Sequence, residues 1–172
     1  AVAASQSDTD SPIAVYQQME KPTWNKIGIT SPVLLQNLNA MDCSAPLSVQ
    51  AKAIPHVLTG ADVLVGTYTG SGKTLAFLTP VLQRLLWSND DDEEGEDPGL
   101  AVVIVAPGRE LASQIASVAR TLVENTPLRV QLAIGGTTFT RNWDQIRKRK
   151  PNILIGTPGR LAELIVGKPG EK

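Results

Sequence analysis

Four short, continuous apolar runs recur in this chain after residue 60, and stretches with helical spacing separate them. A run of Val, Ile and Leu without polar alternation is typical of a strand that is covered on both faces. Helices between such strands supply that cover as right-handed crossovers. The pattern therefore predicts an α/β fold in which a parallel sheet is flanked by helices. We expect strands at 62–66, 100–106, 129–134 and 152–156, and helices at 73–86, 109–124, about 143–150 and 158–166.

The length of 172 residues, 42% of them hydrophobic, is enough for one domain with a proper core. Residues 1–22 mix small and polar side chains without a clear period, so we expect a flexible N-terminal arm there. We assign residues 23–172 to the domain itself. Within it, residues 88–99 gather seven acidic side chains and no apolar ones, which predicts a solvated acidic loop.

The composition excludes several protein classes. No apolar run approaches the roughly 18–20 residues that span a bilayer, and the first residues lack the apolar stretch of a secretory signal. The single cysteine, Cys43, cannot close an internal disulfide or complete a metal-ligand set. We therefore expect an intracellular, reducing compartment, either cytoplasm or nucleus. Because the chain begins at Ala1 rather than Met, a processed end is a further interpretation, which would fit a chloroplast or a mitochondrion.

The net charge of −1 conceals an uneven distribution. Residues 1–97 carry five Lys and Arg against twelve Asp and Glu, whereas residues 98–172 carry eleven against five. A basic C-terminal half favours a polyanion as partner, and a solvated basic helix face explains the same charge equally well. The basic run at 147–150 leaves the same two interpretations open, with the helix face favoured there.

The segment GTYTGSGKT at 66–74 directly follows the first expected strand and opens the first expected helix. This is the context of a phosphate-binding loop: Gly70 and Gly72 allow a tight turn with inward N–H groups, and the helix N-terminus adds partial positive charge. Lys73 would pair with the β- and γ-phosphate oxygens of a nucleotide, and the Thr74 hydroxyl would bind Mg²⁺. Upstream, the Gln50 carboxamide precedes an apolar helical stretch and could select adenine, since it can donate to and accept from the same base edge.

Three further motifs lie after this loop, each close to the end of an expected strand. They are PGRELASQ at 107–114, the pair Gly135-Gly136, and TPGRL at 157–161. In TPGRL, Thr157 suits an N-cap and Pro158 the first helical position, so free N–H groups and the Arg160 guanidinium could meet a phosphate. In isolation, each motif would also fit an ordinary capped helix or turn.

Taken together and in this order, the motifs resemble those of the DEAD-box family of ATP-dependent RNA helicases. From about Trp24 to its end, the chain is similar to the first of that family's two RecA-like domains, with residues 42–50 as its glutamine motif. Two differences are that Gly108 stands where the family has threonine, and that the chain ends before an Asp-Glu-Ala-Asp sequence.

The resemblance implies ATP and Mg²⁺ as cofactors, RNA as partner, and local opening of duplex RNA by the full-length protein. For ATP it implies Trp24, Gln50, Thr69, Gly70, Ser71, Gly72, Lys73 and Thr74, with Lys73 and Thr74 catalytic and Thr74 the metal ligand. For the RNA backbone it implies Pro107, Arg109, Gly135, Gly136, Thr157, Pro158, Gly159 and Arg160.

Because no acidic tetrad is present, we expect this chain to bind ATP but to hydrolyse little of it alone. We also expect one edge of the sheet to be exposed. Either this edge leads to self-association, or it is covered by the remainder of a helicase or by a protein partner. Two other functions are consistent with parts of the pattern: an assembly module that has lost catalysis, and a small-molecule kinase with the same phosphate loop.

Overall fold

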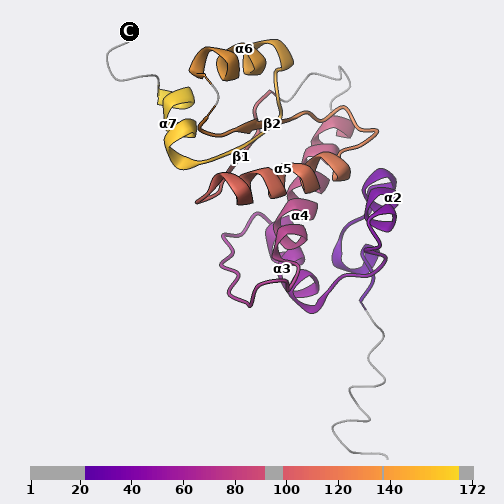
Figure 1. Ribbon diagram of the computed structural model, residues 1–172. Coiled ribbons are helices and arrows are strands. Elements are labelled where there is room, and N and C mark those ends of the chain that lie inside the picture. The colour runs from indigo at the N-terminus through magenta and orange to yellow at the C-terminus, as the bar shows by residue number, and fades with distance from the viewer. Residues whose placement is uncertain (1–21, 92–98, 137, 167–172) are drawn as a thin grey trace, which may run out of the picture.

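A computed structural model describes residues 22–91, 99–136 and 138–166 of the chain (Figure 1). The expected arm at 1–22 therefore lies outside the described residues, apart from Pro22. Regular structure begins with a short turn of 3-10 helix and continues through six α-helices and three strands. In chain order these are η1 (Asn25–Ile27), α2 (Pro32–Ala40), α3 (Ser48–Leu58), α4 (Lys73–Asp91), β1 (Val102–Val105), α5 (Arg109–Leu122), β2 (Val130–Ala133), α6 (Phe139–Arg149), β3 (Ile153–Gly156) and α7 (Pro158–Val166).

The three strands form one parallel sheet in the order β1-β3-β2. Val102 of β1 and Val130 of β2 both pair with Ile153 of β3, so the strands are in register and end together. Their carboxyl ends therefore lie at one edge of the sheet, where ligands of parallel α/β sheets commonly bind. The fold class that the apolar runs predict is confirmed.

Helices cover the sheet on both faces (Figure 1). On one face, Ile153 and Ile155 join a large core that α2, α4 and α5 share. On the other face, Leu154 packs with Ala133 and with Leu161 and Leu164 of α7. Successive side chains of a strand point to opposite faces, and all four residues of β3 are buried accordingly. The central strand thus belongs to two apolar layers at once.

Close contact between β2 and β3 depends on a glycine. A Cβ added to Gly156 would lie 2.1 Å from the carbonyl oxygen of Ala133, far inside van der Waals contact. The N–H of Thr157, the next residue, donates to that same Ala133 oxygen. The carboxyl ends of β2 and β3 can therefore approach this closely only because residue 156 has no side chain.

The expected strand at 62–66 is wrong as a strand: the structure has no strand there. Leu64 is fully exposed and Val63 is 38% exposed. An apolar run becomes a strand when a neighbouring strand can take its backbone hydrogen bonds, and no described segment pairs with this one. The described sheet therefore has three strands rather than four.

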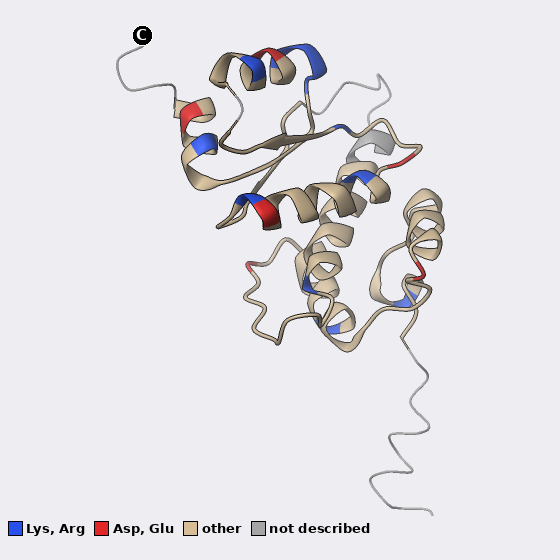
Figure 2. Ribbon diagram, in the orientation of Figure 1, with Lys and Arg blue, Asp and Glu red and all other residues tan. Residues whose placement is uncertain are grey.

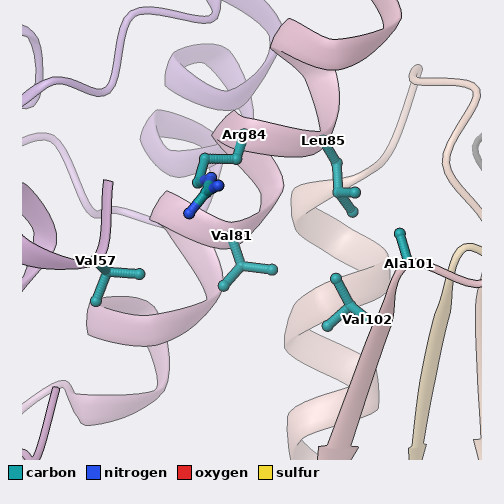
Figure 3. A pocket seen from close by; sticks show the side chains of 6 residues that line it. All are labelled: Val57, Val81, Arg84, Leu85, Ala101 and Val102. Atoms are coloured by element: carbon teal, nitrogen blue, oxygen red, sulfur yellow. The ribbon is translucent and has the colours of Figure 1, made fainter. Parts of the chain in front are cut away.

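No strand among the described residues pairs with the outer edge of β1. Val103 and Val105 are 44% and 60% exposed, although the run reads as a fully covered strand. Beside the start of β1 lies a pocket of ≈ 310 Å³ that opens between α3, α4 and the strand (Figure 3). Its lining is mostly apolar and consists of Val57, Val81, Arg84, Leu85, Ala101 and Val102.

Several helix boundaries also differ from the expected ones. Helix α4 continues to Asp91, so the first four residues of the segment expected as an acidic loop, 88–91, are helical, while 92–98 lie outside the described residues. Helix α6 begins at Phe139 rather than near Trp143. Helix α2 was not predicted from the sequence.

Two buried amides fasten the N-terminal helices to the rest of the domain. The Asn37 Nδ2 of α2 donates to the carbonyls of Leu122 and Glu124, each at 2.9 Å, and so caps the end of α5. The Gln83 Oε1 of α4 accepts from the N–H groups of Thr30 and Ser31 at the start of α2. Buried polar groups that are paired in this way hold their elements in one arrangement.

Candidate functional site

The loop before α4 has the backbone of a phosphate cradle at its second half. Gly70 and Gly72 adopt φ of 80° and 90°, a backbone region that residues other than glycine rarely adopt. Helix α4 then begins at Lys73, directly after the second glycine. The partial positive charge of the helix N-terminus therefore faces the turn of the loop.

The Lys73 ammonium lies across this loop. Its Nζ donates to the carbonyl oxygens of Thr67 and Tyr68, at 2.9 and 2.6 Å. Thr69 and Gly70 are exposed, while Lys73 and Thr74 are partly exposed and therefore within reach of a ligand in the loop. The ammonium would exchange these two carbonyls for phosphate oxygens, which are stronger acceptors because they are charged.

Gln50 is attached directly to the loop. It stands in the first turn of α3, inside the helix rather than ahead of it, and is 2% exposed. Its Nε2 donates to the Gly72 carbonyl at 3.1 Å, and its Oε1 accepts from the Leu47 N–H at 2.7 Å. A Cβ on Gly72 would lie 2.5 Å from that Nε2. The structure thus joins the glutamine motif to the phosphate loop, 22 residues apart in the sequence.

Ser71 gives a direct indication that the loop suits an acceptor-rich group. Its hydroxyl is buried and has no hydrogen-bond partner among the described residues. A buried hydroxyl without a partner costs stability, and a phosphate oxygen is the acceptor that such loops bind. The residues present therefore fit a nucleotide phosphate.

Trp24 is placed elsewhere. Its ring is 4% exposed and belongs to the large core, and its indole N–H donates to the Cys43 carbonyl at 2.7 Å. The ring is therefore packed in the core of this structure, and its role in binding adenine stays a prediction. No sequence signal separates a stacking tryptophan from a core tryptophan.

The three later motifs meet in one groove of ≈ 530 Å³ at the carboxyl edge of the sheet. Each motif follows a different strand: the first follows β1, the double glycine follows β2, and TPGRL follows β3. The lining comprises Pro107, Gly108, Arg109, Gly135, Thr157, Pro158, Gly159, Arg160 and Glu163. Seven of the eight residues expected to contact RNA are in this lining, and Gly136 is the exception.

The double glycine lies beside an arginine. A Cβ on Gly135 would lie 3.7 Å from the Arg109 guanidinium carbon, and one on Gly136 would lie 3.5 Å from a terminal nitrogen of the same group. Gly136 also has a φ of 96°. These distances are ordinary van der Waals contacts, so they place the exposed Arg109 side chain beside the turn after β2, and the backbone of Gly136 is what favours glycine there.

The start of α7 lies on the other side of the groove. The helix begins at Pro158 as expected, and the Thr157 carbonyl accepts its first bond, from the N–H of Leu161. Arg160 is held by Glu163, with 3.0 Å between Nε and Oε2. Glu163 was missed by the sequence analysis, although its spacing of three residues from Arg160 on a helix is that of an ion pair.

Lys and Arg residues gather along α6 and lie farther apart on the rest of the fold, and Asp and Glu residues are scattered (Figure 2). Within the described part of the chain, no group of three or more His, Cys, Asp or Glu gathers as a metal site. None of the helices described here combines the length and apolar character that crossing a membrane requires.

The chain matches the family model of the DEAD/DEAH box helicases over residues 47–171. A rice protein named DEAD-box ATP-dependent RNA helicase 47B is 40% identical over 140 residues, which cover 79% of this chain and 24% of that protein. The ATP-dependent RNA helicase DRS1 of Pyricularia oryzae is 38% identical over 157 residues, 91% of this chain and 18% of that protein. The chain thus spans less than a third of the length of these relatives.

Solved structures give the same result for the fold. A DEAD box protein from Methanococcus jannaschii matches with a TM-score of 0.70 and 27% identity, over 82% of this chain and 36% of that one. A hypothetical ATP-dependent RNA helicase from Sulfolobus tokodaii matches with a TM-score of 0.66 and 30% identity, over 78% and 36%.

Proposed function

Because the chain belongs to the DEAD/DEAH box helicase family, we propose that it is the ATP-binding and RNA-contacting part of an ATP-dependent RNA helicase. The observation that carries the proposal is the groove in which motifs from three separate strand ends converge. Neither a small-molecule kinase nor a vestigial phosphate loop requires such a groove. The proposal concerns binding by this chain and unwinding by the longer protein.

The chain's own residues would bind ATP by surrounding its phosphates. Backbone N–H groups from Gly70 to Lys73 surround the phosphates, and the Ser71 hydroxyl gains the acceptor that it lacks. Lys73 moves from the loop carbonyls to phosphate oxygens. Mg²⁺, when bound beside Thr74, would neutralise phosphate charge. None of these side chains, nor Gln50, is a carboxylate that could orient water, so slow hydrolysis by this chain is part of the proposal.

For adenine, Gln50 would act from a fixed position. Both ends of its amide already bond within the protein, so it holds the loop to α3 and leaves one remaining N–H and one lone pair for a base. An amide anchored in this way loses little entropy when the base binds. We infer that ATP is bound more tightly than GTP.

The nucleotide proposal is tested by titrating labelled ATP and GTP into the chain and into Lys73→Ala and Gln50→Glu. Lys73→Ala removes a charge-assisted bond to phosphate and is expected to weaken ATP binding by about 10- to 100-fold. Gln50→Glu cannot donate to the Gly72 carbonyl and is expected to lower affinity and loosen the loop. Equal affinities of the chain and Lys73→Ala would contradict the proposal.

For RNA, the groove would hold phosphates between Arg109 and the start of α7. Arginine forks and helix N-terminal N–H groups bind phosphate without reading bases. We therefore expect binding to single strands of any sequence. Arg109→Ala should reduce affinity and lower the slope of log K against log salt by about 0.7. Lys52→Ala on α3, an exposed cation away from the groove, is the matched control, and equal losses in both variants would count against the groove.

The open edge of β1 leads to a proposal about the longer protein. Val103, Val105 and the pocket beside α4 are apolar surface that a soluble sheet rarely leaves uncovered. We propose that further chain of the helicase covers this edge. A longer chain extended past residue 172 should then melt at a higher temperature than the chain of 172 residues, and an unchanged Tm would contradict this proposal.

A further inference from the structure

A second cationic site lies at the opposite end of the sheet from the groove. There, a pocket of ≈ 280 Å³ is lined by three arginines from three different elements: Arg120 in α5, Arg129 just before β2, and Arg149 in α6. All three residues are exposed, and no acidic residue is in the lining. The Arg129 Nε donates to the Lys150 carbonyl at 3.0 Å, which fixes this side chain beside the end of α6. Three arginines in the lining of one pocket are the pattern of an anion-binding site.

The floor of this pocket is apolar and has one polar group. Val123, Leu128 and Pro151 are buried there, so a ligand would meet a surface that prefers a flat or aliphatic group. Gln131 also lines the pocket and is 6% exposed. Its Nε2 donates to the Leu132 carbonyl and to Gln145 Oε1, but its Oε1 is buried without a partner among the described residues. The accessible lining therefore suits a ligand that carries an anionic group beside an apolar one.

Helix α6 connects this pocket with the groove. It begins four residues after Gly135, which lines the groove, and it ends at Arg149, which lines the pocket. Its 11 residues span about 16 Å. Between the two ends, Arg141, Arg147 and Lys148 are exposed, and Asp144 is the single acidic residue of the helix (Figure 2).

An aromatic pair lies on the same helix. Trp143 is 39% exposed and stacks on Phe139, with ring centroids 6.2 Å apart. Exposed aromatic rings between cations are what single-stranded nucleic acids stack on. An acidic peptide would use the arginines and the cations along α6 equally well, but a nucleic-acid base also stacks on the exposed ring of Trp143.

We propose that α6 and the three-arginine pocket form a second contact site for single-stranded RNA, which an RNA strand reaches after it leaves the groove. The arginines hold a phosphate, and the apolar floor receives one unstacked base. This inference rests on the proposed RNA binding by the groove, because the two sites are occupied by one strand.

The experiment compares two RNA lengths by fluorescence anisotropy. A strand of about 6 nucleotides fills the groove alone, whereas one of about 24 nucleotides also reaches the pocket. The double variant Arg120→Ala/Arg149→Ala should bind the long strand about 5- to 20-fold more weakly, with a salt slope smaller by about 1.4. Affinity for the short strand should not change. Lys52→Ala is the matched control, and equal Tm values establish that the variants fold.

Each other outcome overturns the inference in a recognisable way. If the double variant binds the long strand like Lys52→Ala, the pocket takes no RNA. If its affinity falls equally for both RNA lengths, the arginines act on the groove or on the fold. If the double variant binds a polyglutamate peptide more weakly but binds RNA unchanged, the pocket is a protein-binding site. If the unchanged chain binds neither length, the proposed function itself has failed.

Discussion

At the scale of single residues, glycines determine how close the functional groups can come. The Gly72 carbonyl accepts from Gln50, and a side chain on Gly72 would overlap both Gln50 Nε2 and Leu47 Cδ1. Gly70, in the same loop, has no atom within 4 Å of its would-be Cβ. The two glycines share a left-handed backbone but differ in what surrounds them.

We therefore predict different effects from two alanine substitutions. Gly70→Ala should cost about 1–2 kcal/mol through backbone strain alone. Gly72→Ala should cost more, because it adds overlap with Gln50 to the same strain. Urea denaturation and ATP titration of both variants provide the measurement. Equal losses of stability and affinity would mean that Gln50 does not support the loop.

A second residue-scale prediction concerns Glu163, whose carboxylate lies in the groove and holds Arg160 at 3.0 Å. Glu163→Gln removes a negative charge from a surface proposed to bind phosphate and releases the Arg160 fork. Affinity for a short single-stranded RNA should rise by about 2- to 5-fold, because the groove loses a negative charge that repels phosphate. A fall in affinity would show instead that Glu163 positions Arg160 for RNA. The Arg160 side chain is only 11% exposed, so loss of its charged partner should also lower the free energy of unfolding.

At the scale of elements, the groove depends on how closely β2 and β3 pack. Gly156→Ala would place a methyl group against the Ala133 carbonyl and force these strands apart at their carboxyl ends. The expected loss of unfolding free energy is about 1–3 kcal/mol. Gly159→Ala is the control, since its Cβ would meet nothing within 4 Å and alanine favours the helix. Chemical denaturation of both variants decides, and equal stability would contradict this account of the sheet.

Strands were predicted correctly where the chain also supplies a neighbouring strand that pairs with them. Three of the four expected strands formed because each is hydrogen-bonded to another described strand. The run at 62–66 has the same apolar character, but a sequence pattern carries no information about the availability of a neighbour. The positions of Asn37 and Gln83 were equally unpredictable, since each caps a helix more than 50 residues away.

The candidate site was easier to predict than the core. Its residues occur in short motifs at strand ends, and a parallel register gathers those ends at one edge. Trp24 was harder, because a buried and a stacking tryptophan look alike in a sequence. That its assigned residues bind ATP and RNA stays a prediction.

At the scale of the whole molecule, the open edge of β1 predicts self-association of the chain by itself. Val103 and Val105 present apolar side chains beside unpaired backbone groups. Sedimentation of the chain should show a larger species that grows with concentration, and Val103→Lys/Val105→Lys should suppress it. Val166→Lys, at an 84% exposed position on α7, is the control. A single monomeric species at high concentration would contradict the prediction.

The central claim is that motifs from three strand ends form one RNA-binding groove. Hydrogen exchange of the chain, with and without a short single-stranded RNA, tests it most directly, because it reports each segment separately. The account predicts slower exchange at residues 108–110, 135–136 and 159–161 together, and no change at α2 or α3. Protection of one of these segments without the others, or none at all under saturating RNA, would contradict it.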